Sequence, residues 1–314
     1  MRSGFWRGLA RRRAFTLIEL LVVIAIVALL MSILVPTLSR ARQEARATQC
    51  LGQLHVLGQG LVIYVDENRD AMPPSRLPKL SGKPCEPYAL IYGRPKYRPT
   101  FVASMSTAVG VPPFDDPKAC KDEIDIHGEK GDRQNYSYPL YVCPSVSDWT
   151  DERNGAYGYN YQFLGNSRLL IENNPSSPYK NWPVRLGRVR YPARTVMAGD
   201  SMGTAATFSP MARKPYMNNT NDAQRLGDEG FNLDPPWVDP VNGEMASLPD
   251  HRSAADPRHR GKAGILWVDG HAGSHTLEQL GYRLAEDGSV ALEGDNSQWS
   301  GNGQNVPWTL EFQP

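Results

Sequence analysis

The sequence has no excess of charge of either sign. Its 314 residues contain 34 Lys and Arg against 33 Asp and Glu, a formal net charge of +1. Nucleic-acid-binding domains are strongly basic because phosphate contacts dominate their affinity, so we expect no nucleic acid partner. Low-complexity repeats are also absent. The 14 Tyr and 7 Trp indicate a folded, turn-rich chain and not a disordered tail.

Cysteine is scarce, and no two cysteines have the C-x-x-C spacing of common zinc sites. Spacing alone therefore predicts no metal site. In an oxidising compartment the cysteines can form disulfides. An even number allows three complete pairings, among which the sequence does not choose, and free buried thiols are the alternative. The four residues are Cys50, Cys85, Cys120 and Cys143.

A serine-nucleophile motif is missing as well. The nucleophile elbow of α/β-hydrolases is G-x-S-x-G, and Gly199-Asp200-Ser201 does not fit it. We interpret this tripeptide as a turn at a strand end. We predict no catalytic residues and do not expect an enzyme.

One long apolar run stands out near the N-terminus. Residues 14–35 contain one ionisable group, Glu19, and about 20 apolar residues suffice for a helix to cross a bilayer. We predict a transmembrane helix over residues 15–36. The basic leader, residues 1–14, has no acid and indicates a cytoplasmic N-terminus. A plain signal anchor is the simplest alternative, but a carboxylate in hydrocarbon is costly and calls for a partner. The leader's five arginines are Arg2, Arg7, Arg11, Arg12 and Arg13.

The segment Phe15-Thr16-Leu17-Ile18-Glu19, after a basic leader, resembles the motif of type IV prepilins and type II secretion pseudopilins. The resemblance implies cleavage between Ala14 and Phe15 by a prepilin peptidase, which also methylates Phe15. It assigns Glu19 to assembly, as the partner of the N-terminal amine of a neighbouring subunit. Pro36 matches a helix-kinking proline of many pilins. One departure is Ala14, because the family usually has Gly before the cut.

The helix is expected to continue past Pro36 as an amphipathic helix at residues 37–66. Apolar residues recur there at steps of three and four, which is typical of one face of an amphipathic helix. Pro73-Pro74 ends any helical continuation. We expect a loop-rich segment at residues 67–134. The residues of the predicted face are Leu38, Ala41, Ala45, Thr48, Leu51, Leu54, Gly58, Leu61 and Val65.

Residues 135–314 are predicted to be β-rich, because short apolar segments there are bounded by turn residues. We expect an α+β fold, in which the long helix packs on an antiparallel sheet of at least four strands, as in pilins. Residues 218–255 are interpreted as a surface excursion. The expected strand segments are 136–142, 157–164, 195–198, 263–268, 272–277, 290–292 and 309–312.

His259 is followed by nine residues and then Asp269-Gly270. Asp-Gly is a preferred two-residue hairpin turn with positive φ at both residues. We predict a C-terminal hairpin in which the imidazole of His259 approaches the carboxylate of Asp269. The pattern resembles the H-x9-DG processing-associated domain found on many prepilin-type proteins. Supporting matches are Thr48-Gln49-Cys50-Leu51-Gly52-Gln53-Leu54, Cys143-Pro144-Ser145, Tyr157-Gly158-Tyr159-Asn160 and Ala198-Gly199-Asp200-Ser201.

Metal binding is the competing interpretation of the C-terminal polar residues. The simpler interpretation is that they are hydrogen-bonded residues at hairpin ends, and we predict no cofactor. Resemblance to major pseudopilins adds Ca²⁺ as an alternative, with Asp269, Asp295 and Asn296 as candidates, although no EF-hand spacing is present. Candidates for another metal are His251, His259, His271, His275, Asp250, Asp256 and Asp269.

These features predict a structural, prepilin-type subunit of a pilus or type II secretion pseudopilus. Its expected partners are the prepilin peptidase and methylase, other pilin or pseudopilin subunits, the assembly platform and the membrane. We expect a single-pass inner-membrane protein with a periplasmic ectodomain, which reaches the cell surface after assembly. Loss of the leader would leave an acidic mature chain. The alternative is a membrane-anchored extracellular binding protein or enzyme. The large ectodomain favours this alternative, or a minor or tip subunit.

Overall fold

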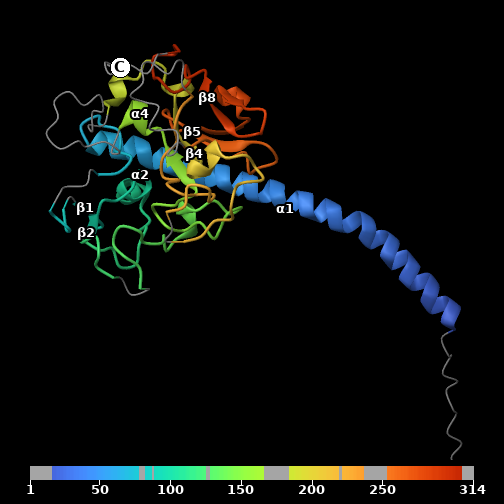
Figure 1. Ribbon diagram of the computed structural model, residues 1–314. Coiled ribbons are helices and arrows are strands. Elements are labelled where there is room, and N and C mark those ends of the chain that lie inside the picture. The colour runs from blue at the N-terminus through green and yellow to red at the C-terminus, as the bar shows by residue number, and fades with distance from the viewer. Residues whose placement is uncertain are drawn as a thin grey trace, which may run out of the picture. The chain divides into compact units, whose positions relative to one another are not determined.

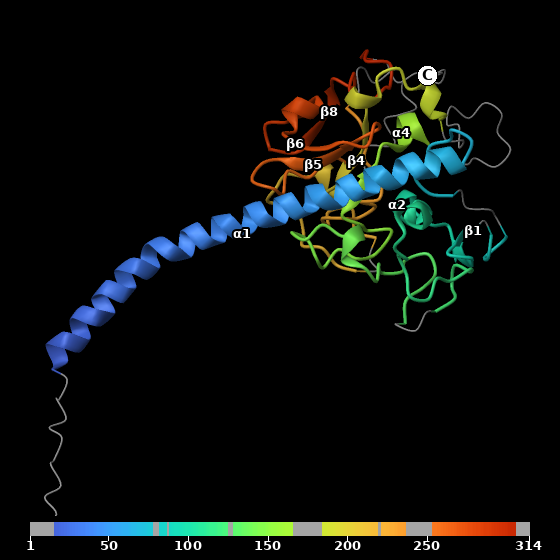
Figure 2. The same cartoon turned by 180° about the vertical axis from the view of Figure 1, so that it is seen from behind.

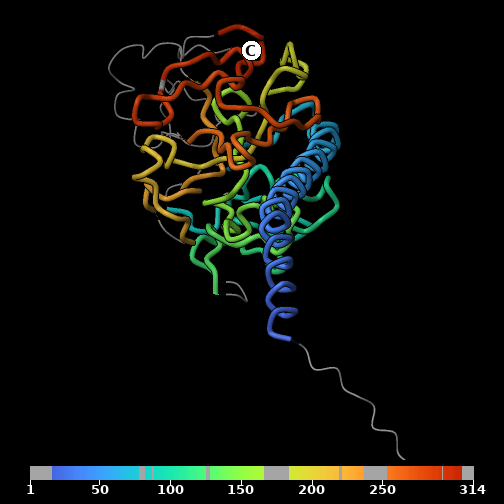
Figure 3. Tube along the Cα trace, turned by 90° about the vertical axis from the view of Figure 1, so that its right-hand side faces the viewer, coloured from blue at the N-terminus to red at the C-terminus, as the bar shows by residue number. Residues whose placement is uncertain are grey.

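A computed structural model describes residues 16–77, 82–86, 88–124, 128–165, 184–218, 221–236 and 253–305. Its longest element is the helix α1, Leu17–Glu67, which continues without a break through Pro36 (Figure 1, Figure 3). Proline removes one backbone hydrogen bond of a helix. Next to it the Thr37 hydroxyl donates to the carbonyl oxygens of Ile33 and Leu34, at 3.1 and 2.8 Å. The predicted continuation of the helix of residues 15–36 into residues 37–66 is therefore confirmed.

The chain divides into two units, Met1–Ala45 and Arg46–Pro314. In the first unit, every α1 side chain is exposed. The most apolar 18-residue window of α1 has a mean hydropathy of 3.1 and none of it is buried. A helix this apolar and this long can cross a membrane by length and composition. This agrees with the predicted transmembrane helix.

In the second unit, α1 contributes a buried stripe to the core. Spacings of three and four residues place these side chains on one helical face. The prediction of that face is confirmed from Leu54 onward, whereas its earlier members Leu38, Ala41, Ala45 and Thr48 are exposed. The buried residues of α1 are Cys50, Gln53, Leu54, Leu57, Gly58, Gly60, Leu61 and Val65.

The core of the second unit contains a four-stranded sheet of order β3-β4-β5-β6. Each neighbouring pair is antiparallel. The sheet lies along the C-terminal part of α1 (Figure 2), so the predicted α+β, pilin-like arrangement is confirmed. The strands are β3 Tyr157–Tyr159, β4 Val196–Asp200, β5 Ala263–Trp267 and β6 Ala272–His275.

The two faces of this sheet pack against different residues. Side chains alternate between the faces of a strand, and β5 follows that rule. Leu266 belongs to the cluster that includes the buried stripe of α1. Ile265 and Trp267 belong to a second cluster with Trp299, which is fully buried. The central strands are therefore covered on both sides.

The segment 67–134, expected to be loop-rich, contains a hairpin and two short helices. Lys96 lies in this hairpin and is fully buried, and its Nζ contacts Glu152 Oε1 at 2.6 Å. Removing one partner of a buried ion pair strongly destabilises a folded protein. This pair therefore holds the segment 67–134 against the β-rich part, to which Glu152 belongs. The elements are β1 Tyr88–Ile91, β2 Arg94–Tyr97, α2 Phe101–Ser104 and α3 Ser106–Val109.

The remaining expected strands have mixed outcomes. Residues 136–142 contain the 3-10 helix η1, Pro139–Tyr141, where we expected a strand. Residues 157–164 are a short strand followed by the helix α4, Tyr161–Leu164. The expected strand at 290–292 lies in β8, Val290–Gly294, which pairs with β7, Tyr282–Leu284. Residues 309–312 lie outside the described residues. Further 3-10 helices are η2 Leu186–Arg188, η3 Pro192–Arg194, η4 Gly203–Thr207 and η6 Glu278–Leu280.

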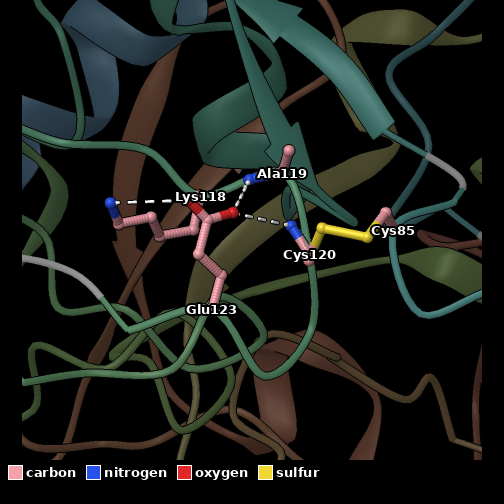
Figure 4. Close-up of a disulfide and its surroundings, with 5 residues drawn as sticks. All are labelled: Cys85, Lys118, Ala119, Cys120 and Glu123. Atoms are coloured by element: carbon pink, nitrogen blue, oxygen red, sulfur yellow. Dashed lines mark hydrogen bonds and ion pairs between the residues drawn. A yellow bond between two sulfur atoms is a disulfide. The ribbon is translucent and has the colours of Figure 1, made fainter.

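One disulfide joins Cys85 to Cys120, and Cys50 and Cys143 are free and buried. Beside the disulfide, the Glu123 carboxylate accepts backbone N–H groups of Ala119 and Cys120 at 3.2 and 3.3 Å (Figure 4). The sequence left the cysteine pairing open, and the structure contains one disulfide and two free thiols. A disulfide of this kind persists in an oxidising compartment.

Candidate functional site

Glu19 has a partner inside its own chain. Thr16 donates its backbone N–H and its hydroxyl to Oε2 of Glu19, both at 2.8 Å, and the Glu19 N–H donates to the Thr16 hydroxyl at 3.2 Å. This reciprocal pair is a capping box, which satisfies donors at the start of a helix. The residue predicted to act in assembly thus caps the N-terminus of α1. The predicted cleavage and methylation residues, Ala14 and Phe15, lie outside the described residues.

The predicted pairing of His259 with Asp269 is wrong. Asp269 Oδ1 instead lies 2.5 Å from Nδ1 of His271, two residues away, and their side chains are 36% and 50% exposed. His259 Nε2 lies 3.2 Å from Oδ2 of Asp200, which is fully buried. The nine-residue spacing spans the whole strand β5, so His259 and Asp269 belong to opposite ends of it.

The turn at Asp269-Gly270 also differs from the expected two-residue type. Trp267 N–H donates to the carbonyl oxygen of His271 and Gly270 N–H donates to that of Trp267, both at 2.9 Å. The loop therefore has three residues, 268–270. Gly270 has a φ of 91°, whereas Asp269 is not among the described residues with positive φ. A type I turn followed by one left-handed glycine is a common three-residue hairpin loop.

His259 belongs to a buried cluster with Cys50, Cys143 and Asp200, whose potential ligand atoms all lie within 4.8 Å of one another. Cys143 Sγ lies 3.4 Å from His259 Nε2, and Cys50 Sγ lies 3.5 Å from Asp200 Oδ1. We call these four residues the cysteine–aspartate–histidine cluster. Cys50 comes from α1, Cys143 follows η1, Asp200 ends β4, and His259 precedes β5.

Backbone geometry holds Asp200 in place. The N–H of Gly264 donates to Oδ2 of Asp200 at 2.6 Å. A Cβ on Gly264 would lie 3.1 Å from this oxygen and 3.5 Å from Sγ of Cys50. Glycine therefore lets strand β5 pass close behind the carboxylate and the thiol.

Three further side chains surround the cluster. The buried Arg258 donates from Nη2 to the carbonyl oxygen of Ser201 at 2.5 Å, and its Nη1 lies 3.9 Å from Asp200 Oδ1. Tyr157 places its hydroxyl 3.4 Å from Sγ of Cys50. Ser145 places its Oγ 3.4 Å from Nδ1 of His259, the ring nitrogen that faces away from Asp200.

The cluster changes the protonation of its own members. A hydrogen bond from Cys50 lowers the pKa of the Cys143 thiol to about 6 and, with burial, raises the pKa of Cys50. Burial lowers the pKa of His259, but Asp200 and Cys143 outweigh it and raise that pKa to about 10. Burial raises the pKa of Asp200, but Arg258 and His259 bring it below its usual value. Cys143 therefore favours the thiolate, the form of cysteine that binds metals.

Apart from His259, the metal ligands considered from the sequence do not form a group of three or more within the described residues. Asp256 Oδ2 pairs with Nε of Arg258 at 3.0 Å. His271 stacks on Trp267 and His275 meets the same ring edge-on. Residues 250 and 251 lie outside the described residues. Within the described residues, Asp295 does not belong to the one group of three or more His, Cys, Asp or Glu side chains that could hold a metal.

Sequence reasoning missed Cys50, Cys143 and Asp200 as members of a site. A signal for them was present, because each lies in a short segment that supports the H-x9-DG resemblance. The structure brings three of those segments and His259 to one point. Motif spacing did not reveal the cluster, because its four residues come from four distant parts of the chain.

Comparison with known proteins identifies one segment. Residues 9–35 match the family described as the prokaryotic N-terminal methylation motif. The chain thus carries a prepilin-type motif, which implies processing by a prepilin peptidase and is consistent with a membrane anchor. No curated protein and no solved structure matches the chain.

Proposed function

We propose that this protein is a structural, prepilin-type subunit of a pilus or a type II secretion pseudopilus, without catalytic activity of its own. The observation that carries the proposal is the position of the methylation motif, residues 9–35, which overlaps the exposed apolar part of α1. The same helix continues into the core of the second unit. The chain thus combines a segment suited to lipid with a folded ectodomain.

In this proposal, the peptidase cuts between Ala14 and Phe15 on the cytoplasmic side of the inner membrane and methylates Phe15. The ectodomain lies in the periplasm, where the disulfide Cys85–Cys120 persists. The apolar helices then pack into a fibre core on an assembly platform. Glu19 neutralises the amine of a neighbouring subunit, because an unpaired carboxylate in lipid is unfavourable. The C-terminal part is of the H-x9-DG type and faces outward, which suits a minor or tip subunit.

Mass spectrometry of the membrane-extracted protein tests the proposal. We expect a mature N-terminus of methylated Phe15, and a sheared extracellular or periplasmic fibre fraction that contains the protein. A strain without the peptidase should retain Met1 and form no fibres. An intact Met1 in the wild-type strain, or a cut after the apolar run, would refute the assignment.

A cavity favours a second candidate function, that of a membrane-anchored binding protein for anionic ligands. The cavity has a volume of about 660 Å³ and is lined by six Arg and Lys but only three Asp and Glu. Two of these acids pair with lining cations, Glu229 with Arg153 at 3.2 Å and Asp122 with Lys130 at 3.7 Å, so positive charge is in excess. The lining cations are Arg76, Arg98, Lys121, Lys130, Arg133 and Arg153.

Calorimetric titration with polygalacturonate, and with neutral dextran as the control, tests this second function. Binding of polygalacturonate that falls at least about tenfold in Lys121→Glu would support it, since attraction to a charged groove depends on its net charge. No binding of polygalacturonate, or equal binding of dextran, would contradict this second function and leave the role of a prepilin-type subunit as the proposal.

A further inference from the structure

We propose that the cysteine–aspartate–histidine cluster is a structural zinc site, which fastens α1 to the sheet of the second unit. Cys50, Cys143, Asp200 and His259 each supply one ligand atom. The inference goes beyond the proposed function, because neither the methylation motif nor a fibre role requires a metal.

The separations of the potential ligand atoms are close to those around a tetrahedral ion. Zinc binds sulfur at about 2.3 Å, and nitrogen and carboxylate oxygen at about 2.0–2.2 Å. Tetrahedral angles then set nitrogen and oxygen about 3.3 Å apart, and sulfur about 3.5 Å from either of them. In the structure, His259 Nε2 lies 3.2 Å from Asp200 Oδ2 and 3.4 Å from Cys143 Sγ, and Cys50 Sγ lies 3.5 Å from the other carboxylate oxygen, Oδ1. The four potential ligand atoms, one from each residue, all lie within 4.8 Å of one another, so small side-chain movements would bring them to tetrahedral distances.

The charges of the buried cluster also fit a divalent cation. Two thiolates and one carboxylate would carry three negative charges, of which Zn²⁺ neutralises two. The remaining charge faces Arg258, whose Nη1 lies 3.9 Å from Asp200 Oδ1 and whose side chain is 6% exposed. Buried charges are costly unless they are paired or coordinate a metal. Arg258 also pairs with Asp256 Oδ2 at 3.0 Å, so this cation is shared between two carboxylates, and zinc would supply most of the compensating charge.

Outer contacts orient the ligands as in known zinc sites. Metal-binding histidines usually donate their second ring N–H to a neighbouring acceptor. Here Nε2 of His259 faces the cluster and Nδ1 faces Ser145 Oγ at 3.4 Å. The N–H of Gly264 holds Oδ2 of Asp200 at 2.6 Å. These contacts fix the imidazole and the carboxylate before any metal arrives.

The ligand types select the metal. Thiolates are soft ligands that favour zinc, whereas calcium takes six to eight oxygen ligands. With two sulfurs, one nitrogen and one carboxylate, the cluster does not suit Ca²⁺. Four protein ligands in a buried place leave no open position for a substrate, which is the pattern of a structural zinc site and not of a catalytic one.

The site would connect four distant segments of the second unit. Cys50 lies on the buried stripe of α1, and Asp200 ends a central strand of the sheet. The ion would thus attach the helix directly to the sheet, at the point where α1 enters the core. Closing long loops restricts the unfolded chain and so stabilises the folded one.

The competing chemistry is a disulfide between Cys50 and Cys143, whose sulfur atoms lie within 4.8 Å of each other. A disulfide would consume two of the four ligands and exclude the metal. The two states differ in mass, thiol reactivity and metal content, so they can be separated by measurement.

The test uses the full-length protein, extracted in detergent and purified without a metal-affinity tag. We expect elemental analysis to find about one zinc per chain, as a closed four-ligand site requires. Replacement of zinc by Co²⁺ should produce the intense absorption of cobalt-thiolate bonds. Chelation should lower the melting temperature, and added zinc should restore it. Absence of zinc, together with a Cys50–Cys143 disulfide in mass spectrometry, would overturn the proposal.

Matched variants locate the ion. Cys143→Ser and His259→Ala should each lower the zinc content at least about tenfold, because each removes one of the four ligands. The double variant Cys85→Ala with Cys120→Ala removes the disulfide and should keep one zinc per chain, as should His271→Ala. Ser145→Ala, which changes an outer contact, should weaken zinc binding about tenfold. Unchanged zinc in both ligand variants, whether or not they fold, would show that the metal is bound elsewhere.

Discussion

Gly58 of α1 lies directly against Gly270 of the β5–β6 turn. A Cβ on Gly58 would stand 2.3 Å from the Gly270 carbonyl oxygen and 2.8 Å from Cδ1 of Leu266. Distances this short to a backbone atom cannot be relieved by a side-chain movement. The glycine of the H-x9-DG motif therefore serves two needs: its φ of 91° forms the turn, and its carbonyl touches the helix.

Gly58→Ala should therefore destabilise the protein, although alanine is the better helix former. We expect the free energy of unfolding to fall by about 1–3 kcal/mol, the usual cost of inserting a methyl group into a tight contact. Gly52→Ala is the matched control on the same helix, because a Cβ there meets no atom within 4 Å. It should stabilise by up to about 1 kcal/mol. Thermal unfolding followed by circular dichroism measures both, and equal effects of the two would contradict the close contact.

Substitution of Asp200 and of Asp269 should have very different effects on the free energy of unfolding. Asp200 is fully buried and contacts His259 and Gly264, so Asp200→Ala should cost about 3–5 kcal/mol of unfolding free energy, as for other broken buried pairs. Asp269 forms an exposed pair with His271, so Asp269→Ala should cost less than about 1 kcal/mol. Chemical denaturation of both variants provides the measurement. A larger loss for Asp269→Ala would restore the His259–Asp269 pairing that the sequence suggested.

The sequence was sufficient for the long helix, because an apolar run and then a three-to-four spacing persist over it. It also placed the segments of β4, β5 and β6, since apolar residues there lie between turn residues. It failed at residues 136–142, where Pro139 begins a 3-10 helix and removes a strand hydrogen bond. In this segment, the effect of Pro139 on the backbone was stronger than the strand preference of the neighbouring apolar residues.

The candidate site was predictable only in part. The sequence identified His259 as a motif residue but predicted Asp269 as its partner. That prediction assumed a local hairpin, which would bring two residues close in the sequence into contact. Its actual partner, Asp200, comes from a strand that pairs with β5. That pairing depends on the order of strands in the sheet, which no local spacing encodes. Cys50, on α1, and Cys143, after η1, were missed because their contacts depend on how the helix and this loop pack on the sheet.

Stability should depend on pH through Asp151, whose side chain is buried. Burial raises its pKa to about 6, against about 3.9 in an unfolded chain. Between these values the folded state holds a proton that the unfolded state has released. Stability should therefore fall by about 3 kcal/mol as pH rises from about 4 to about 6 and then stay level.

Asp151→Asn tests this dependence. The amide oxygen can still accept the Arg153 N–H, which Asp151 Oδ1 receives at 2.9 Å. The variant should flatten the stability profile between about pH 4 and 6 and exceed the wild type above that range. Denaturation at a series of pH values measures the slope, with Asp222→Asn as the control, because Asp222 is only half-buried and pairs with Lys214. A wild-type slope that persists in Asp151→Asn would assign the titration to another group.

Glu19 has two separable roles, the cap of α1 and the proposed partner of a neighbouring amine. Glu19→Gln keeps a capping side chain but removes the charge, whereas Thr16→Val removes the hydroxyl partner and keeps the charge. If the charge carries assembly, Glu19→Gln should reduce fibres by about a hundredfold. An unpaired charge in lipid costs a few kcal/mol, enough for such a factor. Thr16→Val should then assemble nearly as the wild type does.

The measurement is the amount of subunit in the sheared fibre fraction, normalised to the membrane content of mature subunit. Mass spectrometry should show that both variants are inserted and cut before Phe15, so that a loss of fibres reflects assembly alone. The reverse pattern, in which Glu19→Gln assembles and Thr16→Val does not, would show that Glu19 acts only as a helix cap. The charge-dependent pattern is expected, because a cap alone could be formed by an uncharged glutamine at the same position.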